Sequence, residues 1–179
     1  MATPPDDQNK LRLINETMRQ AESRLGAQLT AALAADARAM QFISFIAAIT
    51  VFLISVALAA LEVTGWPLEI SAVAGVGVLG FILAGRHAYE AAKPVPFEFV
   101  GGYPSAWLSD IEQDKPLTDA LLEQLDLYEG MLQKNRASME AASSALRRAA
   151  TTIGVTLLIC GIMAAALWVS RLVAAMPAH

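Results

Sequence analysis

Few residues in this chain could carry out catalysis. The two histidines are His87, which follows Arg86, and His179, and neither stands at a metal-ligand or nucleophile spacing. The single cysteine, Cys160, lies inside an apolar stretch, so the sequence offers no intrachain disulfide and no thiolate metal cluster. We therefore expect no enzyme activity, no cofactor and no bound metal ion.

Two local patterns resemble binding motifs, but their context favours simpler explanations. Gly75, Gly77 and Gly80 match a dinucleotide-binding spacing, yet they lie in an apolar run with no preceding strand. Close contact between membrane helices explains the glycines better, and we expect Gly75 and Gly80 to serve in assembly. Solvation at the surface explains four carboxylates better than a metal site does. These are Glu98, Asp110, Glu112 and Asp114.

A mildly polar stripe is the feature most compatible with transport. Gln41, Ser44 and Ser55 fall on one face of the apolar run 39–61. In an oligomer this stripe could line a pore, and hydrogen bonding between helices is the alternative. The apolar runs carry no ionisable residue at their centres, which argues against a proton relay, an ion-coupled carrier and a voltage sensor.

The composition indicates a membrane protein. Hydrophobic residues make up 55% of the 179 residues and are concentrated in blocks, while only 17% are charged. Thirteen basic and 17 acidic residues give a net charge of −4, which leaves no electrostatic footprint for nucleic acid. Because residues 1–38 lack an early apolar run, we expect no cleavable signal peptide and expect the first span to direct insertion.

Three apolar runs are long enough to cross a bilayer, namely 39–61, 68–86 and 149–171. Residues 1–38 and 86–148 hold 12 of the 13 lysines and arginines. The positive-inside rule therefore predicts a cytoplasmic N-terminus and an outer C-terminus. We expect an all-α integral membrane protein of the bacterial inner membrane with three transmembrane helices.

A charged stalk helix is expected before the first span and again before the third. Residues 8–38 place apolar side chains on one helical face, and no proline separates them from the first span. Residues 117–148 carry the a/d seam of a coiled coil, in which a polar member predicts a fixed register and partner number. The stalks could pair within one chain or between chains. The seam residues assigned to oligomerisation are Leu121, Leu125, Tyr128, Leu132, Asn135, Met139 and Leu146.

Residues 87–116 are the region expected to be irregular, because they hold four prolines and a glycine pair. The aromatic residues within it suggest a loop that binds a protein partner or a small ligand, and docking on the stalk or the headgroups is the alternative. These aromatics are Phe97, Phe99, Tyr103 and Trp107. The predicted order is a disordered lead 1–7, stalk 8–38, span 39–61, outer turn 62–67, span 68–86, irregular loop 87–116, coiled-coil helix 117–148, span 149–171 and outer tail 172–179.

The spacing of Tyr128, Asn135, Leu146 and Ala149 ahead of a span, after an earlier helical hairpin, resembles small bacterial membrane effectors of antiphage systems. The two-span proteins called SLATT domains are an example, and this chain adds a third span. The resemblance implies an oligomer that acts in antiviral defence and breaches the membrane when an intracellular signal reaches its cytoplasmic part.

The leading hypothesis is a non-enzymatic, self-assembling membrane protein that forms a pore or disrupts the membrane under control of its stalk. The alternative is an accessory or structural subunit, or a scaffold, of a larger membrane complex. Expected partners are the lipid bilayer, further copies of the chain and a protein bound at the stalk or at loop 97–107. We expect no nucleic acid partner.

Overall fold

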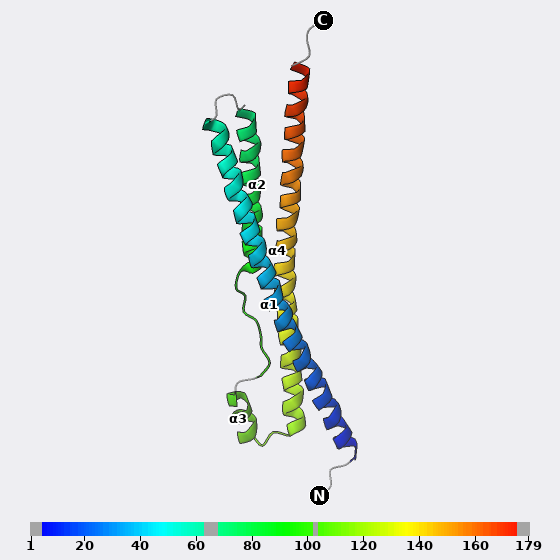
Figure 1. Cartoon of the computed structure of the whole chain (residues 1–179). Coiled ribbons are helices and arrows are strands. Elements are labelled where there is room, and N and C mark those ends of the chain that lie inside the picture. The colour runs from blue at the N-terminus through cyan, green and yellow to red at the C-terminus, as the bar shows by residue number, and fades with distance from the viewer. Residues whose placement is uncertain (1–4, 63–67, 102–103, 175–179) are drawn as a thin grey trace. The chain divides into compact units, whose positions relative to one another are not determined.

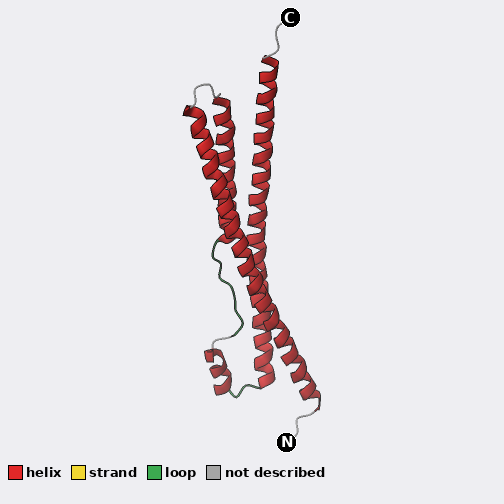
Figure 2. Cartoon of the chain, in the orientation of Figure 1, coloured by secondary structure: helices red, strands yellow, loops and turns green. Residues whose placement is uncertain are grey.

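The computed structural model describes residues 5–62, 68–101 and 104–174, and every regular element in these ranges is a helix (Figures 1 and 2). The predicted all-α fold class is confirmed. Three of the helices, α1, α2 and α4, are long and apolar enough to cross a membrane. The helices are α1 (Pro5–Glu62), α2 (Leu68–Ala92), α3 (Pro104–Glu112) and α4 (Leu117–Ala174).

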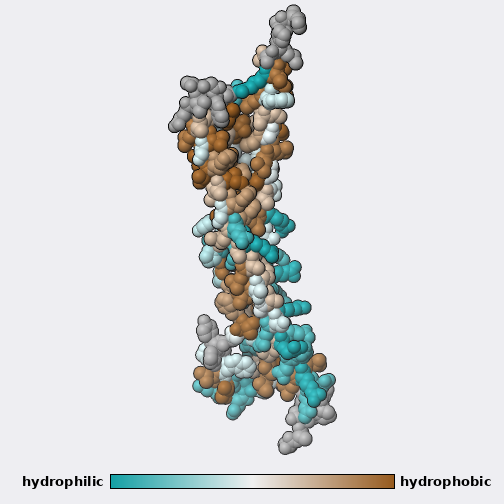
Figure 3. All heavy atoms as spheres, in the orientation of Figure 1, coloured by the Kyte–Doolittle hydropathy of each residue, from teal (hydrophilic) through white to brown (hydrophobic). Residues whose placement is uncertain are grey.

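The chain divides into two compact units. The polar unit combines Met1–Ala35 with Pro94–Glu140, and the apolar unit combines Asp36–Lys93 with Ala141–His179. α1 and α4 each contribute a part to both units. Hydrophobic residues dominate the visible surface of the apolar unit, whereas hydrophilic residues are frequent on that of the polar unit (Figure 3).

α1 and α4 each form one uninterrupted helix of 58 residues, as the absence of internal proline predicts. α1 begins at Pro5, within the residues 1–7 that were predicted to be disordered. A proline is tolerated in the first turn of a helix because the N–H that it lacks would form no hydrogen bond within the helix. α1 includes Glu62, and the rest of the predicted outer turn lies outside the described residues. α4 continues to Ala174, so the predicted tail begins as helix, and 175–179 lie outside the described residues.

The prediction that 87–116 is irregular was wrong for much of its length. α2 continues through the alanine-rich stretch after His87 and ends at Ala92, shortly before Pro94, as helices that meet a proline usually do. An extended segment follows, and then α3 begins at Pro104, which suits a first turn. Asp114, with φ of 49°, lies in the left-handed region that aspartate tolerates, between α3 and α4.

Small residues form the core of the apolar unit. Ala84, Ala88 and Ala149 are completely buried and pack with Ile46 of α1 and Phe81 of α2. Because alanine and glycine have almost no side chain, the three helices approach one another closely here. The buried residues of α2 recur at steps of three and four, and are Ala74, Gly77, Phe81, Ala84, Ala88 and Ala91.

Candidate functional site

The predicted seam of α4 faces the interior of the chain. Three of its members are buried and four are half-buried, so the heptad pattern marks the face of α4 that packs against the rest of its own chain. Whether this seam also joins separate chains stays a prediction. The buried members are Leu121, Tyr128 and Asn135, and the half-buried ones are Leu125, Leu132, Met139 and Leu146.

Within the polar unit, α1 and α4 lie side by side and run in the same direction. The hydroxyl of Tyr128 donates a hydrogen bond to Glu22 Oε1 at 3.2 Å. Six residues further along α1, Gln28 Nε2 donates to the backbone oxygen of Leu132 at 3.3 Å. Contacts that advance together along both helices identify a parallel pair, so the two stalk helices pair within the chain.

Asn135 has a partner that the sequence did not predict. Its side chain is 1% exposed, and its amide pairs with the backbone of Glu98 in the extended segment. The Glu98 N–H donates to Asn135 Oδ1 at 2.9 Å, and Asn135 Nδ2 donates to the Glu98 carbonyl oxygen at 3.0 Å. Asn135 therefore clamps the extended segment to α4, and its expected role in fixing the number of chains stays a prediction. Lys134 Nζ adds an exposed ion pair with the Glu98 carboxylate at 3.4 Å.

The aromatic residues of the predicted partner loop occupy different elements. Phe97 and Phe99 lie in the extended segment with their ring centroids 6.5 Å apart, and Phe99 is exposed while Phe97 is half-buried. Trp107 is half-buried on α3, and Tyr103 lies outside the described residues. The described parts of loop 97–107 are thus an extended segment and the start of a short helix.

The polar stripe predicted to line a pore lies on the outside of α1. Gln41, Ser44 and Ser55 are all exposed. Ser44 Oγ donates to the Met40 carbonyl oxygen and Ser55 Oγ to the Val51 carbonyl oxygen, each at 3.0 Å. The serine hydroxyl hydrogens are therefore satisfied within the helix, while the oxygen lone pairs stay open to water or to another helix.

The two glycines predicted to serve in assembly have different surroundings. A Cβ built on Gly80 would overlap the side chain of Thr156, with the Thr156 Cβ only 2.8 Å away, so Gly80 allows α4 to approach α2. A Cβ on Gly75 would meet nothing within 4 Å. Gly77 lies at a buried position of α2, and a Cβ built there would be 3.1 Å from Leu53 Cδ1.

The residues considered for catalysis are scattered over the described structure. Cys160 Sγ contacts the backbone oxygen of Val73 at 3.7 Å, and His179 lies outside the described residues. Asp110 forms an ion pair with Lys115 at 3.4 Å. In the parts of the chain that the structure describes, no three His, Cys, Asp or Glu side chains are placed to hold a metal ion.

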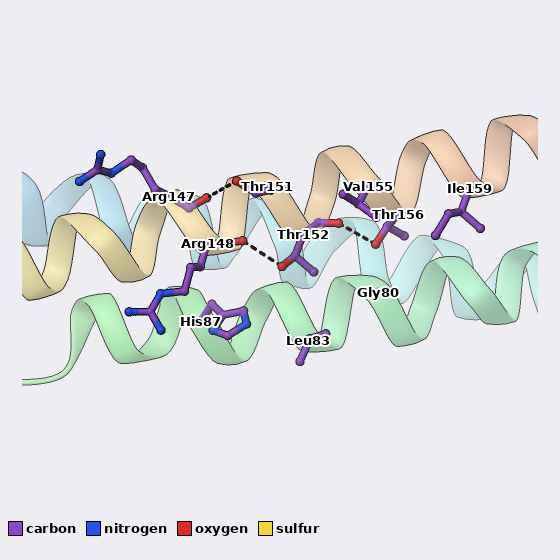
Figure 4. Close-up of a pocket in the computed structure, with 10 residues that line it drawn as sticks. All are labelled: Gly80, Leu83, His87, Arg147, Arg148, Thr151, Thr152, Val155, Thr156 and Ile159. Atoms are coloured by element: carbon purple, nitrogen blue, oxygen red, sulfur yellow. Dashed lines mark hydrogen bonds between the residues drawn. The ribbon is translucent and has the colours of Figure 1, made fainter.

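A groove between α2 and α4 of the apolar unit escaped the sequence analysis (Figure 4). It brings His87 of α2 to the same groove as Arg147 and Arg148 of α4. The sequence does contain a basic pair at the start of an apolar run that is rich in threonine. That this pair shares a groove with His87 depends on how α2 and α4 pack.

No protein-family model, curated protein or solved structure matches this chain. The resemblance to SLATT domains therefore stays a prediction. In the described structure a polar stripe faces outward from the apolar unit, and the heptad seam of α4 packs within the chain.

Proposed function

We propose that this chain is a three-span protein of the bacterial inner membrane that self-assembles through its membrane helices and forms a pore. The N-terminus and the polar unit would lie in the cytoplasm and the C-terminus outside, because 12 of 13 lysines and arginines lie in residues 1–38 and 86–148. The polar unit would receive the intracellular signal that opens the pore.

The exposed stripe on α1 is the observation that carries the pore hypothesis. Hydrocarbon side chains are the usual covering of a helix face that contacts lipid, whereas Gln41, Ser44 and Ser55 present an amide and two hydroxyl oxygens. In the lumen of an oligomer these groups would form favourable hydrogen bonds with water. Because none of them is charged, the pore would show weak selection between cations and anions.

Uncovered apolar surface supports assembly within the membrane. Only 6% of the most apolar 18-residue stretch of α1 is buried inside the chain, and the corresponding shares for α2 and α4 are 22% and 6%. Lipid tails and further copies of the chain would cover the remainder, and Gly75 offers α2 a point for close approach. Since the seam of α4 packs against the chain's own residues, we assign assembly to the membrane helices.

The first test is the native mass of the protein purified in a mild detergent, followed by its conductance in a planar bilayer. A single homo-oligomeric species that conducts supports the proposal. A monomer in detergent and in lipid nanodiscs, or an oligomer that does not conduct, would contradict it.

The stripe itself can be tested with single cysteines, because Cys160 is the only native one. In a Cys160→Ser background, Ser44→Cys and Ser55→Cys should each let a cationic, membrane-impermeant thiol reagent change the ion flux. Phe45→Cys and Phe52→Cys are matched controls, since both positions are exposed on α1 and lie about a quarter of a turn from Ser44. If the lumen lay on another face of α1, the reagent would not change the ion flux of Ser44→Cys or Ser55→Cys.

An accessory or structural subunit is the second candidate, favoured by apolar side chains that the polar unit leaves uncovered. Leu108 and Ile111 of α3 are 57% and 69% exposed, and Phe99 of the neighbouring extended segment is also exposed. Exposed apolar side chains in the polar unit suit a protein partner. The native mass separates the two candidates, because a subunit would be extracted as one copy with a partner that Leu108→Ser/Ile111→Ser releases.

A further inference from the structure

The groove between α2 and α4 is a cavity of about 550 Å³ within the apolar unit. α2 contributes Gly80, Leu83 and His87, which follow one another at steps of three and four and so lie on one face of the helix. α4 contributes a face that runs from Arg147 to Ile159. At ~1.5 Å per residue this face is roughly 18 Å long, which is close to the depth of one leaflet with its headgroups.

Positive charge gathers at one end of the groove. Arg148 extends from α4 beside His87, and Arg147 extends from the same turn of α4 away from His87 (Figure 4). Neither arginine forms an ion pair within the described ranges, and Arg148 Nη2 makes one hydrogen bond, to Ser144 Oγ at 3.3 Å. Both guanidinium groups therefore keep donors free for an anion.

The other end of the groove is apolar. Leu83, Val155 and Ile159 line it and are each about half exposed to the outside of the unit. Three threonines also line it, but each hydroxyl already donates to a backbone oxygen of its own helix. The donors are Thr151, Thr152 and Thr156, and the acceptors are the carbonyl oxygens of Arg147, Arg148 and Thr152 at 2.9, 2.9 and 2.8 Å.

We infer that this groove is a binding site for one anionic phospholipid. The phosphate would accept hydrogen bonds from Arg148 beside His87, while Arg147 at the same end of the groove would add its positive charge. An acyl chain would lie along the apolar wall toward Ile159. A soluble anion would leave that wall uncovered, and a zwitterionic lipid would bring its own ammonium group toward the two arginines. The inference rests on the proposed membrane insertion, with the basic end of the groove at the cytoplasmic surface.

Native mass spectrometry of the full chain, stripped of lipid in detergent, tests the inference. Phosphatidylglycerol and phosphatidylcholine with identical acyl chains are added separately, and we expect phosphatidylglycerol to bind on the order of tenfold more tightly. Arg147→Gln/Arg148→Gln should abolish this preference. Arg38→Gln/Arg86→Gln should preserve it, because this pair removes the same charge near apolar runs but does not line the groove.

A second pair of variants tests the apolar wall without changing the charge. Val155→Trp should fill the groove and weaken the binding of phosphatidylglycerol, whereas Leu157→Trp, on an exposed position outside the groove, should not. Equal binding of the two lipids by the wild type, or an unchanged preference in Arg147→Gln/Arg148→Gln, would overturn the site.

Flotation with liposomes after alkaline extraction is measured on the same samples. Protein that stays inserted but shows no preference between the lipids refutes the lipid site alone. Protein that alkali releases refutes the three-span topology, and the lipid site with it.

Discussion

The side-chain amide of Asn135 pairs with the backbone N–H and carbonyl oxygen of Glu98 at 2.9 and 3.0 Å. A helix side chain here supplies both hydrogen bonds that a neighbouring strand would supply to an extended segment. That segment has few backbone donors, because Pro94 and Pro96 lack an N–H. A single asparagine therefore holds the segment against α4, and only a side chain with both a donor and an acceptor can do so.

Asn135→Asp keeps the acceptor for the Glu98 N–H but places a carboxylate oxygen against the Glu98 carbonyl oxygen. Loss of one buried hydrogen bond and introduction of this repulsion should cost about 2 kcal/mol or more. We expect hydrogen exchange of the amides in 95–100 to rise by tenfold or more, measured by mass spectrometry on the full chain. Asn135→Ala should have a comparable effect.

Gln133→Ala is the control for the Asn135 variants, because the Gln133 side chain is exposed and bonds only to Glu129 on the same helix among the described residues. If Asn135 instead fixed the number of chains in an oligomer, its variants would change the native mass and leave exchange in the extended segment unaltered. That result would contradict the clamp.

Gly80→Ala should separate α2 from α4, because the added Cβ would overlap the side chain of Thr156. Overpacking of this kind costs about 1–3 kcal/mol, and we expect a lower midpoint of thermal unfolding in detergent. Gly161→Ala on α4 is the control, since its Cβ would enter open space, and the better helix propensity of alanine should leave its midpoint unchanged or slightly raised.

Thr156→Ala in the Gly80→Ala background tests the cause of the destabilisation. Removal of the Thr156 hydroxyl and methyl groups should restore part of the lost stability, and the double-mutant cycle should show coupling of about 1 kcal/mol or more. Additive effects of the two substitutions would mean that Gly80 acts on something other than Thr156.

The sequence predicted the long helices well because their signals are local. Apolar periodicity and the lack of proline from Gln8 to Leu61 are enough to predict one helix, and the heptads of α4 correctly mark the face that turns inward. The extension of α2 to Ala92 and the existence of α3 were missed. In both places the nearby prolines predict irregular structure, although helix-forming residues lie between them.

The sites were harder to predict because their partners are distant in the chain. Asn135 and Glu98 are 37 residues apart, and a seam asparagine most often meets another helix, so nothing local indicated a backbone partner. Arg148 and His87 belong to different helices, and their shared groove depends on the close approach that Gly80 allows. Residue types alone could identify each group but not which groups meet.

Leu25→Ala should destabilise the polar unit more than any other single leucine truncation in α1. Leu25 is 1% exposed and is the one leucine of α1 that lies in the buried core of the described residues, so its removal leaves a cavity that costs about 2–4 kcal/mol. Hydrogen exchange across 8–35 should rise accordingly. Leu33→Ala, at a 62% exposed position of the same helix, is the control and should change exchange little. Equal effects would mean that Leu25 is not part of a packed core.

Tyr128 should make the stability of the polar unit depend on pH in the alkaline range. Burial raises the pKa of Tyr128 above its ordinary value of 10.0, and the nearby Glu22 carboxylate raises it further. The folded chain therefore favours the neutral phenol more than the unfolded chain does. This contribution is fully present below about pH 10 and is lost as the pH rises through the raised pKa, where the phenolate would face Glu22.

Tyr128→Phe removes both the titrating group and the hydrogen bond to Glu22. We expect it to lower the free energy of unfolding by about 1 kcal/mol at pH 7 and to lose the wild type's extra decline above pH 10. Lysines titrate in the same range, so the quantity to measure is the difference between the variant and the wild type in denaturant unfolding at each pH. Tyr89→Phe, at an exposed position of α2, should follow the wild type throughout. A constant difference between Tyr128→Phe and the wild type from pH 7 to about pH 11 would show that the phenol is not held against the Glu22 carboxylate.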